Sequence, residues 1–304
     1  IGRLVGSEMC IRDRSFTLSH IRCARRKDLM SKSILITGCS TGIGYVCAHA
    51  LKQKGYQVIA SCRHTDDVER LRNEGLTCIQ LDLADSDSIS SGVKQTLELT
   101  NGKLDALFNN GAYGQPGALE DLPTQALREQ FETNFFGWHQ LVCEVLPVMR
   151  QNGHGRIVQN SSVLGFAAMK YRGAYNASKF ALEGWTDTLR LELHNCDIHI
   201  SLIEPGPIET EFRKNALQAF VKWVDVKDSV HHQQYQNQLQ RLEKESSNNS
   251  FVLPAESCIA PLLHALESDK PKIRYRVTTP TKVFAVLKRL LPSRLLDGIL
   301  RRAA

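Results

Sequence analysis

The sequence predicts an α/β protein with a doubly wound parallel sheet, and two observations lead to this prediction. Short apolar runs alternate with amphipathic segments along most of the chain, and a glycine-rich turn joins the first run to the first amphipathic segment. Continuous aliphatic and β-branched runs are typical of strands that are buried on both faces. Alternation of such strands with helices places helices on both sides of one sheet.

Short apolar runs mark the expected strands at residues 33–36, 57–61, 77–81, 104–108, 156–160, 198–203 and 272–275. Amphipathic segments mark the expected helices at residues 45–53, 66–73, 86–100, 124–151, 174–195 and 255–266. In a sheet of this kind, ligands bind beyond the carboxyl ends of the strands, where the strand order reverses. The glycine turn, Asn110 and Ser162 all fall at such ends.

The domain organisation follows from length and composition. The chain has 304 residues and contains no proline- or glycine-rich linker and no internal repeat, so we expect one domain over residues 30–276. Residues 1–29 show no sustained periodicity, and Met30 stands directly before the first strand. Our hypothesis is that residues 1–29 are an artefactual extension. The alternative, a targeting peptide, is weakened because the segment lacks the long apolar core of a secretory signal.

The composition is that of an ordinary globular protein, with 42% hydrophobic and 7% aromatic residues. Nine cysteines without a Cys-x-x-Cys pair, several of them in apolar segments (Cys47, Cys62 and Cys143), predict reduced, packed thiols in a cytoplasmic protein. Cys196 and His199 are spaced like half of a metal site, but no second pair lies nearby, so we expect no metal. The net charge of +6 is carried partly by the two ends of the chain and does not indicate nucleic-acid binding.

The turn at residues 37–44, Thr-Gly-Cys-Ser-Thr-Gly-Ile-Gly, is the first candidate site. It lies between an expected strand and an expected helix, the context in which a dinucleotide pyrophosphate sits on a helix N-terminus. Glycines allow the backbone to approach the phosphates closely and to adopt positive φ. The turn is weak evidence alone and gains weight from the residues that follow it.

Tyr175 and Lys179 form the second candidate site, and Ser162 lies thirteen residues before the tyrosine. Residues four positions apart on a helix share one face. A tyrosine has a pKa of about 10, and a cation beside it favours the phenolate. Lowering that pKa by ~2–3 units requires roughly 3–4 kcal/mol, which an ammonium and a positively charged nicotinamide would supply in a site sheltered from water. The alternative is a pair that merely decorates a helix surface.

With these motifs in hand, the chain resembles the short-chain dehydrogenase/reductase family in its compact single-domain branch, over roughly residues 31–275. The resemblance rests on Thr-Gly-x-x-x-Gly-Ile-Gly and on Asn109-Asn110-Gly111-Ala112, Asn134, Ser162, Tyr175, Lys179 and Pro205-Gly206. The runs at residues 173–184 and 201–207 are most similar to the hydroxysteroid and retinol dehydrogenase-like branch, which includes bacterial aldehyde and ketone reductases. The fold implied is Rossmann-like.

The resemblance implies a role for each catalytic residue. Tyr175 would donate a proton in carbonyl reduction and accept one in alcohol oxidation. Ser162 would hydrogen-bond the substrate oxygen. Lys179 would lower the Tyr175 pKa and hold the nicotinamide ribose, and Asn134 would position a water that links Lys179 to solvent. The implied cofactor contacts are Gly38, Ser40, Thr41, Gly42, Ile43, Gly44, Asp82, Leu83, Asn110, Gly111, Tyr175, Lys179, Pro205, Gly206, Ile208 and Thr210.

The end of the second strand indicates which dinucleotide binds. A carboxylate there would accept from both ribose hydroxyls and select NAD, but the sequence reads Ser61-Cys62-Arg63. A guanidinium pairs with a phosphate in a bidentate contact, so we expect NADP(H) in preference to NAD(H), with Ser40 as a second phosphate contact by resemblance. The alternative is that Arg63 is a solvated loop residue.

One motif departs from the family pattern. The family usually reads Asn-Asn-Ala-Gly where this chain reads Asn109-Asn110-Gly111-Ala112. We expect the exchange to move a positive-φ position by one residue, with Gly114 absorbing the change.

Two further segments bear on the substrate. By resemblance, residues 211–253 form a helical lid, although 231–250 are polar enough to be a solvated excursion and His231 and His232 are expected on the surface. The run at residues 163–169 is apolar around the catalytic serine and predicts an apolar aldehyde, retinoid or steroid-like ketone. The expected substrate contacts are Ser162, Leu164, Met169 and Tyr175.

The tail at residues 277–304 is basic and amphipathic. Apolar residues recur at helical spacing on both sides of Pro292, with Lys282, Lys288, Arg289 and Arg294 among them. Such a helix lies on a membrane surface, packs on its own domain or packs on a second subunit, and the three alternatives stay open here. No run is long enough to span a bilayer.

The expected function is an NADPH-dependent oxidoreductase that reduces apolar aldehydes or ketones, or oxidises the alcohols, with Tyr175 as acid and base. One alternative is a 3-oxoacyl thioester reductase with the same catalytic residues. An alternative from another class is a non-catalytic NADP(H)-binding regulatory protein, which the intact set of catalytic residues disfavours. We expect a cytoplasmic location, with membrane association through the tail as the variant.

Overall fold

The computed structural model describes residues 31–243 and 251–303. The described residues from Lys32 onward form one compact unit. The hypothesis about residues 1–29 therefore concerns a segment outside the described residues.

A seven-stranded parallel sheet forms the centre of residues 32–304, in the order β3-β2-β1-β4-β5-β6-β7. All neighbouring strands pair in parallel. The strands are β1 Ser33–Ile36, β2 Gln57–Cys62, β3 Thr77–Gln80, β4 Ala106–Asn109, β5 Gly155–Asn160, β6 Ile198–Glu204 and β7 Arg274–Arg276. The order reverses between β1 and β4, which confirms the predicted doubly wound sheet and places the switch point beside the glycine turn.

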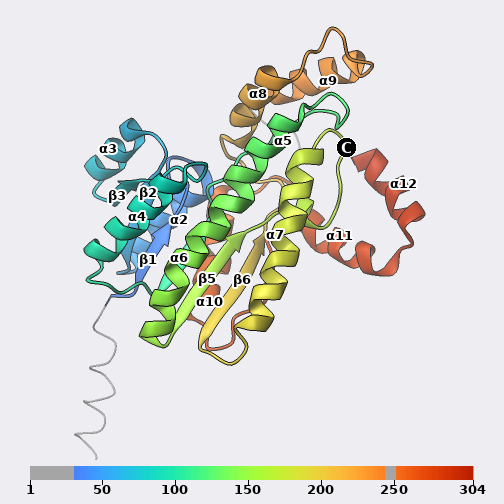
Figure 1. Ribbon diagram of the computed structural model, residues 1–304. Coiled ribbons are helices and arrows are strands. Elements are labelled where there is room, and N and C mark those ends of the chain that lie inside the picture. Colours follow the sequence, from blue (N-terminus) through green and yellow to red (C-terminus); the bar gives the residue numbers. More distant parts are fainter. Residues whose placement is uncertain (1–30, 244–250, 304) are drawn as a thin grey trace, which may run out of the picture. The chain divides into compact units, whose positions relative to one another are not determined.

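Helices cover both faces of the sheet (Figure 1). The described helices are α2 Gly42–Gln53, α3 Thr65–Asn73, α4 Ser86–Leu99, α5 Thr124–Phe131, α6 Gly137–Asn152, α7 Gly173–Glu192, α8 Phe212–Trp223, α9 His232–Glu243, α10 Ile259–Glu267, α11 Thr279–Leu290 and α12 Ser293–Ala303. Because successive residues of a strand point to opposite faces, Ile34 and Ile36 join the core under α2, α3 and α10, whereas Leu35 joins the core under α4, α6 and α7.

The helix expected over residues 124–151 is interrupted by a π-helical turn at Glu132–Phe136. This turn separates α5 from α6 and carries Asn134. The next residue, Gly137, packs so closely that a Cβ atom there would lie 1.9 Å from the Leu83 backbone oxygen. Such turns inside helices occur frequently at functional sites.

The segment between β6 and α10 differs in part from expectation. The polar stretch after residue 230 was open to being a solvated excursion, but residues 232–243 form the helix α9, which packs against α8. The physical reason is Tyr235, which is completely buried in an apolar cluster with Phe220 and Val224. Its hydroxyl donates to Asp121 and accepts from the backbone nitrogen of Ala118, so the loop after β4 anchors the helix.

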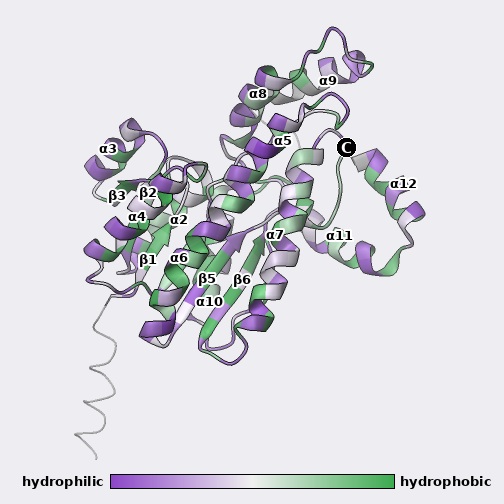
Figure 2. Ribbon diagram, in the orientation of Figure 1, coloured by the Kyte–Doolittle hydropathy of each residue, from purple (hydrophilic) through white to green (hydrophobic). Residues whose placement is uncertain are grey.

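The tail also folds, as α11 and α12, and Figure 2 shows hydrophobic and hydrophilic residues alternating around both helices. Among the described residues, no helix combines the length and apolar character needed to cross a bilayer.

The described cysteines are all free thiols. Cys47 and Cys62 are buried as expected, but Cys143 is exposed, because it lies on the solvent side of α6 beside His139.

Candidate active site

Ser162, Tyr175 and Lys179 meet beyond the carboxyl end of β5. Ser162 lies just after this strand, and the other two residues lie one turn apart on α7. All three are buried, and the Tyr175 hydroxyl forms a hydrogen bond with Ser162. The Lys179 ammonium donates to the backbone oxygen of Asn160 at 2.7 Å and lies 4.2 Å from the centroid of the Trp138 ring. The structure thus brings together the three groups whose spacing drew attention in the sequence.

Burial controls the ionisation of this group. It raises the pKa of Tyr175 to about 12, although the hydrogen bond with Ser162 lowers it. Burial also lowers the pKa of Lys179 to about 7, and the negative charge of Glu183 opposes this effect by raising the same pKa. The described residues by themselves leave the pKa of the phenol above its ordinary value. The expected lowering, which includes the positive charge of a bound nicotinamide, stays a prediction.

The loop that carries Ser162 is tied to both neighbouring elements. The Ser162 hydroxyl oxygen accepts from the backbone nitrogen of Leu164 at 3.1 Å, which caps the short 3-10 turn Val163–Gly165. The first residue of this turn donates to the backbone oxygen of Pro205 at 2.8 Å. The Asn176 amide on α7 donates to the Leu164 oxygen at 3.0 Å. These bonds fix the serine relative to α7 and to the loop after β6.

Asn110 holds three strand ends together at the switch point. Its amide nitrogen donates to the backbone oxygens of Thr37 and Gly38 at 3.0 and 3.1 Å, and its amide oxygen accepts from Asn160 at 2.8 Å. The glycine turn after β1, the end of β4 and the end of β5 are thereby joined through one side chain.

Gly111 corrects the expectation about the Asn-Asn-Gly-Ala motif. Neither Gly111 nor Gly114 has positive φ. Gly111 instead allows a close backbone approach, because a Cβ atom at Gly38 would lie 2.5 Å from the Gly111 Cα, and one at Gly111 would lie 2.8 Å from the Leu83 side chain. The exchange of glycine and alanine therefore concerns packing between two loops, and no positive-φ position is moved.

The glycine turn has the features of an anion site. Gly38 and Gly42 adopt positive φ of 68° and 60°, and α2 begins immediately at Gly42. The N-cap residue Thr41 makes no side-chain capping hydrogen bond, so the first amides of α2 remain available to an anion. A Cβ atom at Gly42 would lie 2.9 Å from the Thr210 side chain, which closes the opposite wall. These residues fit the pyrophosphate of a dinucleotide.

A cavity of about 790 Å³ runs from this turn past Ser162, Tyr175 and Lys179. Most of the expected site residues line it: Gly38, Ser40, Thr41, Gly42, Ile43, Asn110, Gly111, Ser162, Leu164, Met169, Tyr175, Lys179, Pro205, Gly206, Ile208 and Thr210. A volume of this size accommodates a small-molecule ligand.

Five expected residues lie outside the cavity lining: Gly44, Arg63, Asp82, Leu83 and Asn134. Gly44 allows α2 to pack on the turn, since a Cβ atom there would lie 2.3 Å from the Gly38 oxygen. Arg63 follows β2 with an exposed side chain that contacts the ring of His64 at 3.2 Å. Among the described residues it has no ion-pair partner, so its charge is available at the strand end.

Asn134 uses both atoms of its amide on the backbone of Tyr113, accepting from its nitrogen at 3.2 Å and donating to its oxygen at 2.8 Å. The described contacts do not join it to Lys179. Its expected role through a bridging water remains a prediction.

Later segments supply a further cavity wall. Its residues Phe212, Arg213, Asn215 and Ala216 at α8 and Phe251 fall within the segment expected as a lid, whereas Thr279, Pro280, Val283, Phe284 and Leu300 in the tail were not expected at the cavity. The sequence shows that apolar residues of the tail recur at helical spacing. This spacing does not show which part of the protein the apolar face packs against.

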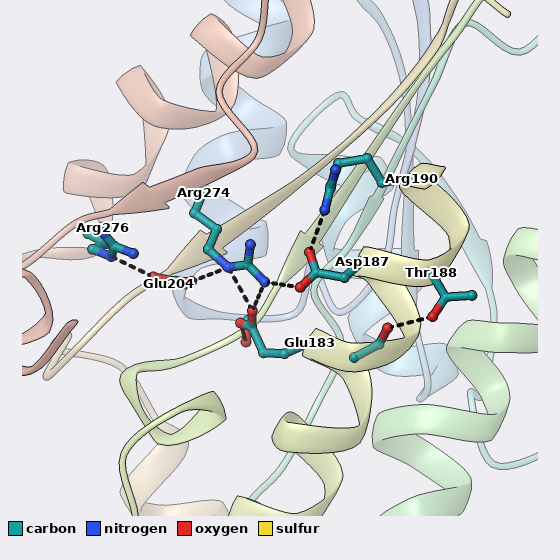
Figure 3. A network of polar contacts seen from close by, with 9 residues as sticks. Glu183, Asp187, Thr188, Arg190, Glu204, Arg274 and Arg276 are labelled. Carbon is teal, nitrogen blue, oxygen red and sulfur yellow. Dashed lines mark hydrogen bonds and ion pairs between the residues drawn. The ribbon is translucent and has the colours of Figure 1, made fainter. Parts of the chain in front are cut away.

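A network of charged residues joins β6, β7 and α7 (Figure 3). Arg274 on β7 lies 3.0 Å from Glu183 and 2.7 Å from Asp187, both on α7, and 3.0 Å from Glu204 on β6. Arg276 also pairs with Glu204, at 3.1 Å. Burial raises the pKa of Glu204 to about 7.

This network reaches the candidate site through Glu183, which accepts a hydrogen bond from the hydroxyl of Ser161, the residue before Ser162. Burial raises the pKa of the Glu183 carboxyl as well, and Arg274 lowers it. The charged groups thus connect β6, β7 and α7 beneath the loop that carries Ser162.

Comparisons with known proteins agree with this geometry. Residues 32–220 match the family described as short chain dehydrogenase. The chain is 42% identical to the uncharacterized oxidoreductase YbbO of Escherichia coli (strain K12) over 276 residues, which are 90% of this chain and 95% of the relative. It is 40% identical to human retinol dehydrogenase 8 over 61% of this chain and 62% of the relative. It is 32% identical to 3-ketodihydrosphingosine reductase of Bacteroides thetaiotaomicron over 88% of this chain and 96% of the relative.

Solved structures share the fold. A short-chain dehydrogenase from Streptomyces avermitilis is 26% identical, with a TM-score of 0.71 over 90% of this chain and 95% of its own. A short-chain dehydrogenase/reductase from Burkholderia phymatum in complex with NAD is 24% identical, with a TM-score of 0.70 over 86% of this chain and 92% of its own. The match over most of the chain and the identity to its relatives show that this protein is an oxidoreductase of the short-chain dehydrogenase/reductase family.

Proposed function

We propose that the protein is an NADPH-dependent reductase of apolar aldehydes or ketones, with Tyr175 as the proton donor. The observation that carries the proposal is the buried group of Ser162, Tyr175 and Lys179, which lines a cavity whose farther walls are mostly apolar. Bound reduced nicotinamide supplies the hydride to the carbonyl carbon.

The chain's own residues complete the reduction on the carbonyl oxygen. Ser162 donates a hydrogen bond to this oxygen from its hydroxyl, which the Leu164 amide holds in place. Tyr175 transfers its hydroxyl proton to the same oxygen as negative charge develops there, and the product is the neutral alcohol. Lys179, with its pKa lowered to about 7, is charged at the acidic side of neutrality and stabilises the phenolate that remains. In alcohol oxidation the same proton moves in the opposite direction.

The preference for NADPH is supported by Arg63. Its exposed guanidinium follows β2, and no described carboxylate pairs with it. The strand end itself reads Ser61-Cys62, so no carboxylate stands where one would repel a 2′-phosphate.

The apolar substrate is supported by the cavity wall. Leu164, Met169, Phe212, Val283 and Phe284 line the cavity. Two relatives carry names of enzymes that act on lipid-like substrates, a retinol dehydrogenase and a 3-ketodihydrosphingosine reductase. Arg172 and Arg213 also line the cavity, and these two basic residues keep a 3-oxoacyl thioester as the second candidate substrate.

A cytoplasmic location is part of the same proposal. It is supported by the buried thiols of Cys62 and Cys78, whose sulfur atoms lie 4.0 Å apart without a bond.

The test is NADPH oxidation by the purified full chain against decanal, retinal, a steroid ketone and an acetoacetyl thioester. We expect turnover of at least one of the first three at a higher kcat/KM than of the thioester. A higher kcat/KM for the thioester would favour the second candidate, and failure to oxidise NADPH with any of them would refute the proposal.

A further inference from the structure

The outer faces of α11 and α12 expose apolar side chains in a continuous pattern. Val283, Val286 and Leu290 follow one another at three- and four-residue spacing on α11, and all are exposed, Leu290 by 72%. On α12, Leu295 is 60% exposed and Ile299 lies one turn later on the same side. The two helices contact each other beside α7 (Figure 1).

The inner faces of the same helices are occupied. Ala285 of α11 and Leu296 of α12 are buried, while Phe284 and Leu300 line the active-site cavity. Packing on the chain's own domain therefore accounts for one side of each helix. It leaves the outer side without a partner in the described part of the chain.

Basic residues border this outer face. Lys282, Arg289, Arg294, Arg301 and Arg302 are all exposed, and Asp297 is the one acidic residue between 279 and 302. None of these five basic residues forms an ion pair with a described residue. Lys288 lies on the inner side of α11, over the ring of Phe180 at 5.1 Å from its centroid. The face combines exposed aliphatic residues with an excess of positive charge, a combination typical of helices that lie on anionic lipid.

The cavity opens towards this face. Val283 is about half exposed and also lines the cavity, next to Phe284. Val283 therefore belongs both to the exposed face of α11 and to the wall of the cavity.

A second copy of the chain is the competing occupant. A two-fold interface places the same patch of both subunits together. It would bring five basic residues of each copy against the same five of the other, with one acidic residue on each side to offset them. An anionic lipid surface offers the complementary charge.

We propose that the outer face of α11 and α12 rests on anionic membrane surface, so that the active-site cavity opens towards the lipid. The binding is peripheral, through the exposed aliphatic residues and the basic residues that border them.

The experiment is flotation of the full chain with vesicles, one set of phosphatidylcholine alone and one set of equal parts phosphatidylglycerol and phosphatidylcholine. We expect at least about tenfold stronger partitioning onto the phosphatidylglycerol vesicles, weakened by salt. Leu290→Ser with Leu295→Ser, and separately Arg289→Glu with Arg294→Glu, should each reduce this partitioning about tenfold or more. Because these four side chains are exposed and do not line the cavity, thermal unfolding should match the wild type.

Two matched controls replace exposed residues elsewhere. Val230→Ser removes an aliphatic side chain that is 82% exposed before α9, and Lys54→Glu with Lys94→Glu reverses two exposed charges at α2 and α4. Val230→Ser should partition onto vesicles like the wild type. The double lysine variant should do the same, except for the small weakening that its lower net charge causes on anionic vesicles. Equal partitioning onto both kinds of vesicle, or equal losses in controls and tail variants, would overturn the proposal. The proposal would also be overturned if the wild type did not bind vesicles and instead sedimented as a dimer without lipid, and if the leucine variants dissociated that dimer.

Discussion

Replacing Arg274 with methionine tests what the charged network contributes to the fold. Arg274 contacts three carboxylates, and its side chain is only one quarter exposed. Methionine keeps an unbranched side chain of similar reach but removes the charge and every hydrogen-bond donor. The change therefore leaves the carboxylates of Glu183, Asp187 and Glu204 in place without their shared cation.

The expected loss in free energy of unfolding depends on which cation each carboxylate still contacts once Arg274 is gone. Removing one partner of a buried pair costs about 3–5 kcal/mol. Asp187 keeps Arg190 at 3.1 Å and is more than one third exposed, so its loss of Arg274 costs about 0–1 kcal/mol. Glu204 keeps Arg276 at 3.1 Å but is almost completely buried. We therefore expect a loss of about 3 kcal/mol at pH 8, at the lower end of the range for buried pairs.

The loss should depend on pH in a defined direction. Burial raises the pKa of Glu204 in the folded protein to about 7, above its ordinary value. Below that pH the folded protein holds a proton on this carboxyl that the unfolded chain releases, and the neutral group needs no cation. The destabilisation caused by Arg274→Met should therefore shrink as the pH falls through about 7.

Urea unfolding at pH 6 and pH 8 measures both effects, with thermal unfolding as a second readout. At pH 8 the midpoint temperature should fall by about 6–12 °C for a domain of this size. Arg190→Met is the matched control, because it breaks the more exposed ion pair of Asp187 with Arg190. It should lower the free energy of unfolding by about 0–1 kcal/mol. The reasoning is refuted if the two variants lose the same stability, or if the Arg274 variant loses as much at pH 6 as at pH 8.

Three further results are expected. Tyr175→Phe removes the transferable proton and should lower kcat by at least about a hundredfold while NADPH binding, measured by fluorescence titration, stays within about twofold; loss of binding in parallel would point to a structural role. Arg63→Glu should weaken NADPH binding at least about tenfold more than NADH binding, because the new carboxylate repels the 2′-phosphate, and equal weakening of the two would exclude the phosphate contact. The rate of carbonyl reduction should fall as the pH rises through about 7, because Lys179, whose pKa burial lowers to about 7, then loses its charge; a profile flat from pH 6 to 8 would contradict this assignment.

The strands and the catalytic group were predictable because both depend on local spacing. Buried parallel strands leave short aliphatic runs, and the predicted runs match β1 to β7 to within a few residues at each end. Tyr175 and Lys179 are four residues apart on one helix, so their proximity needs no knowledge of the tertiary structure.

The rest depends on contacts between distant segments. No local pattern tells that Arg274 on β7 reaches two carboxylates of α7, or that Val283 and Leu300 line the active-site cavity. The role of Gly111 was misjudged for the same reason, since its small size serves an approach to Gly38, more than seventy residues earlier. The depth at which Tyr175 and Lys179 are buried could not be foreseen either, because the sequence reveals a neighbouring lysine but not the elements that cover both groups.

The most direct measurement is a crystal structure of the protein with oxidised cofactor and a bound alcohol. We predict that the alcohol oxygen lies about 3 Å from both the Tyr175 hydroxyl and the Ser162 hydroxyl. An alcohol oxygen held by other groups, with the Tyr175 hydroxyl directed away from it, would contradict the assignment of Tyr175 as the proton donor.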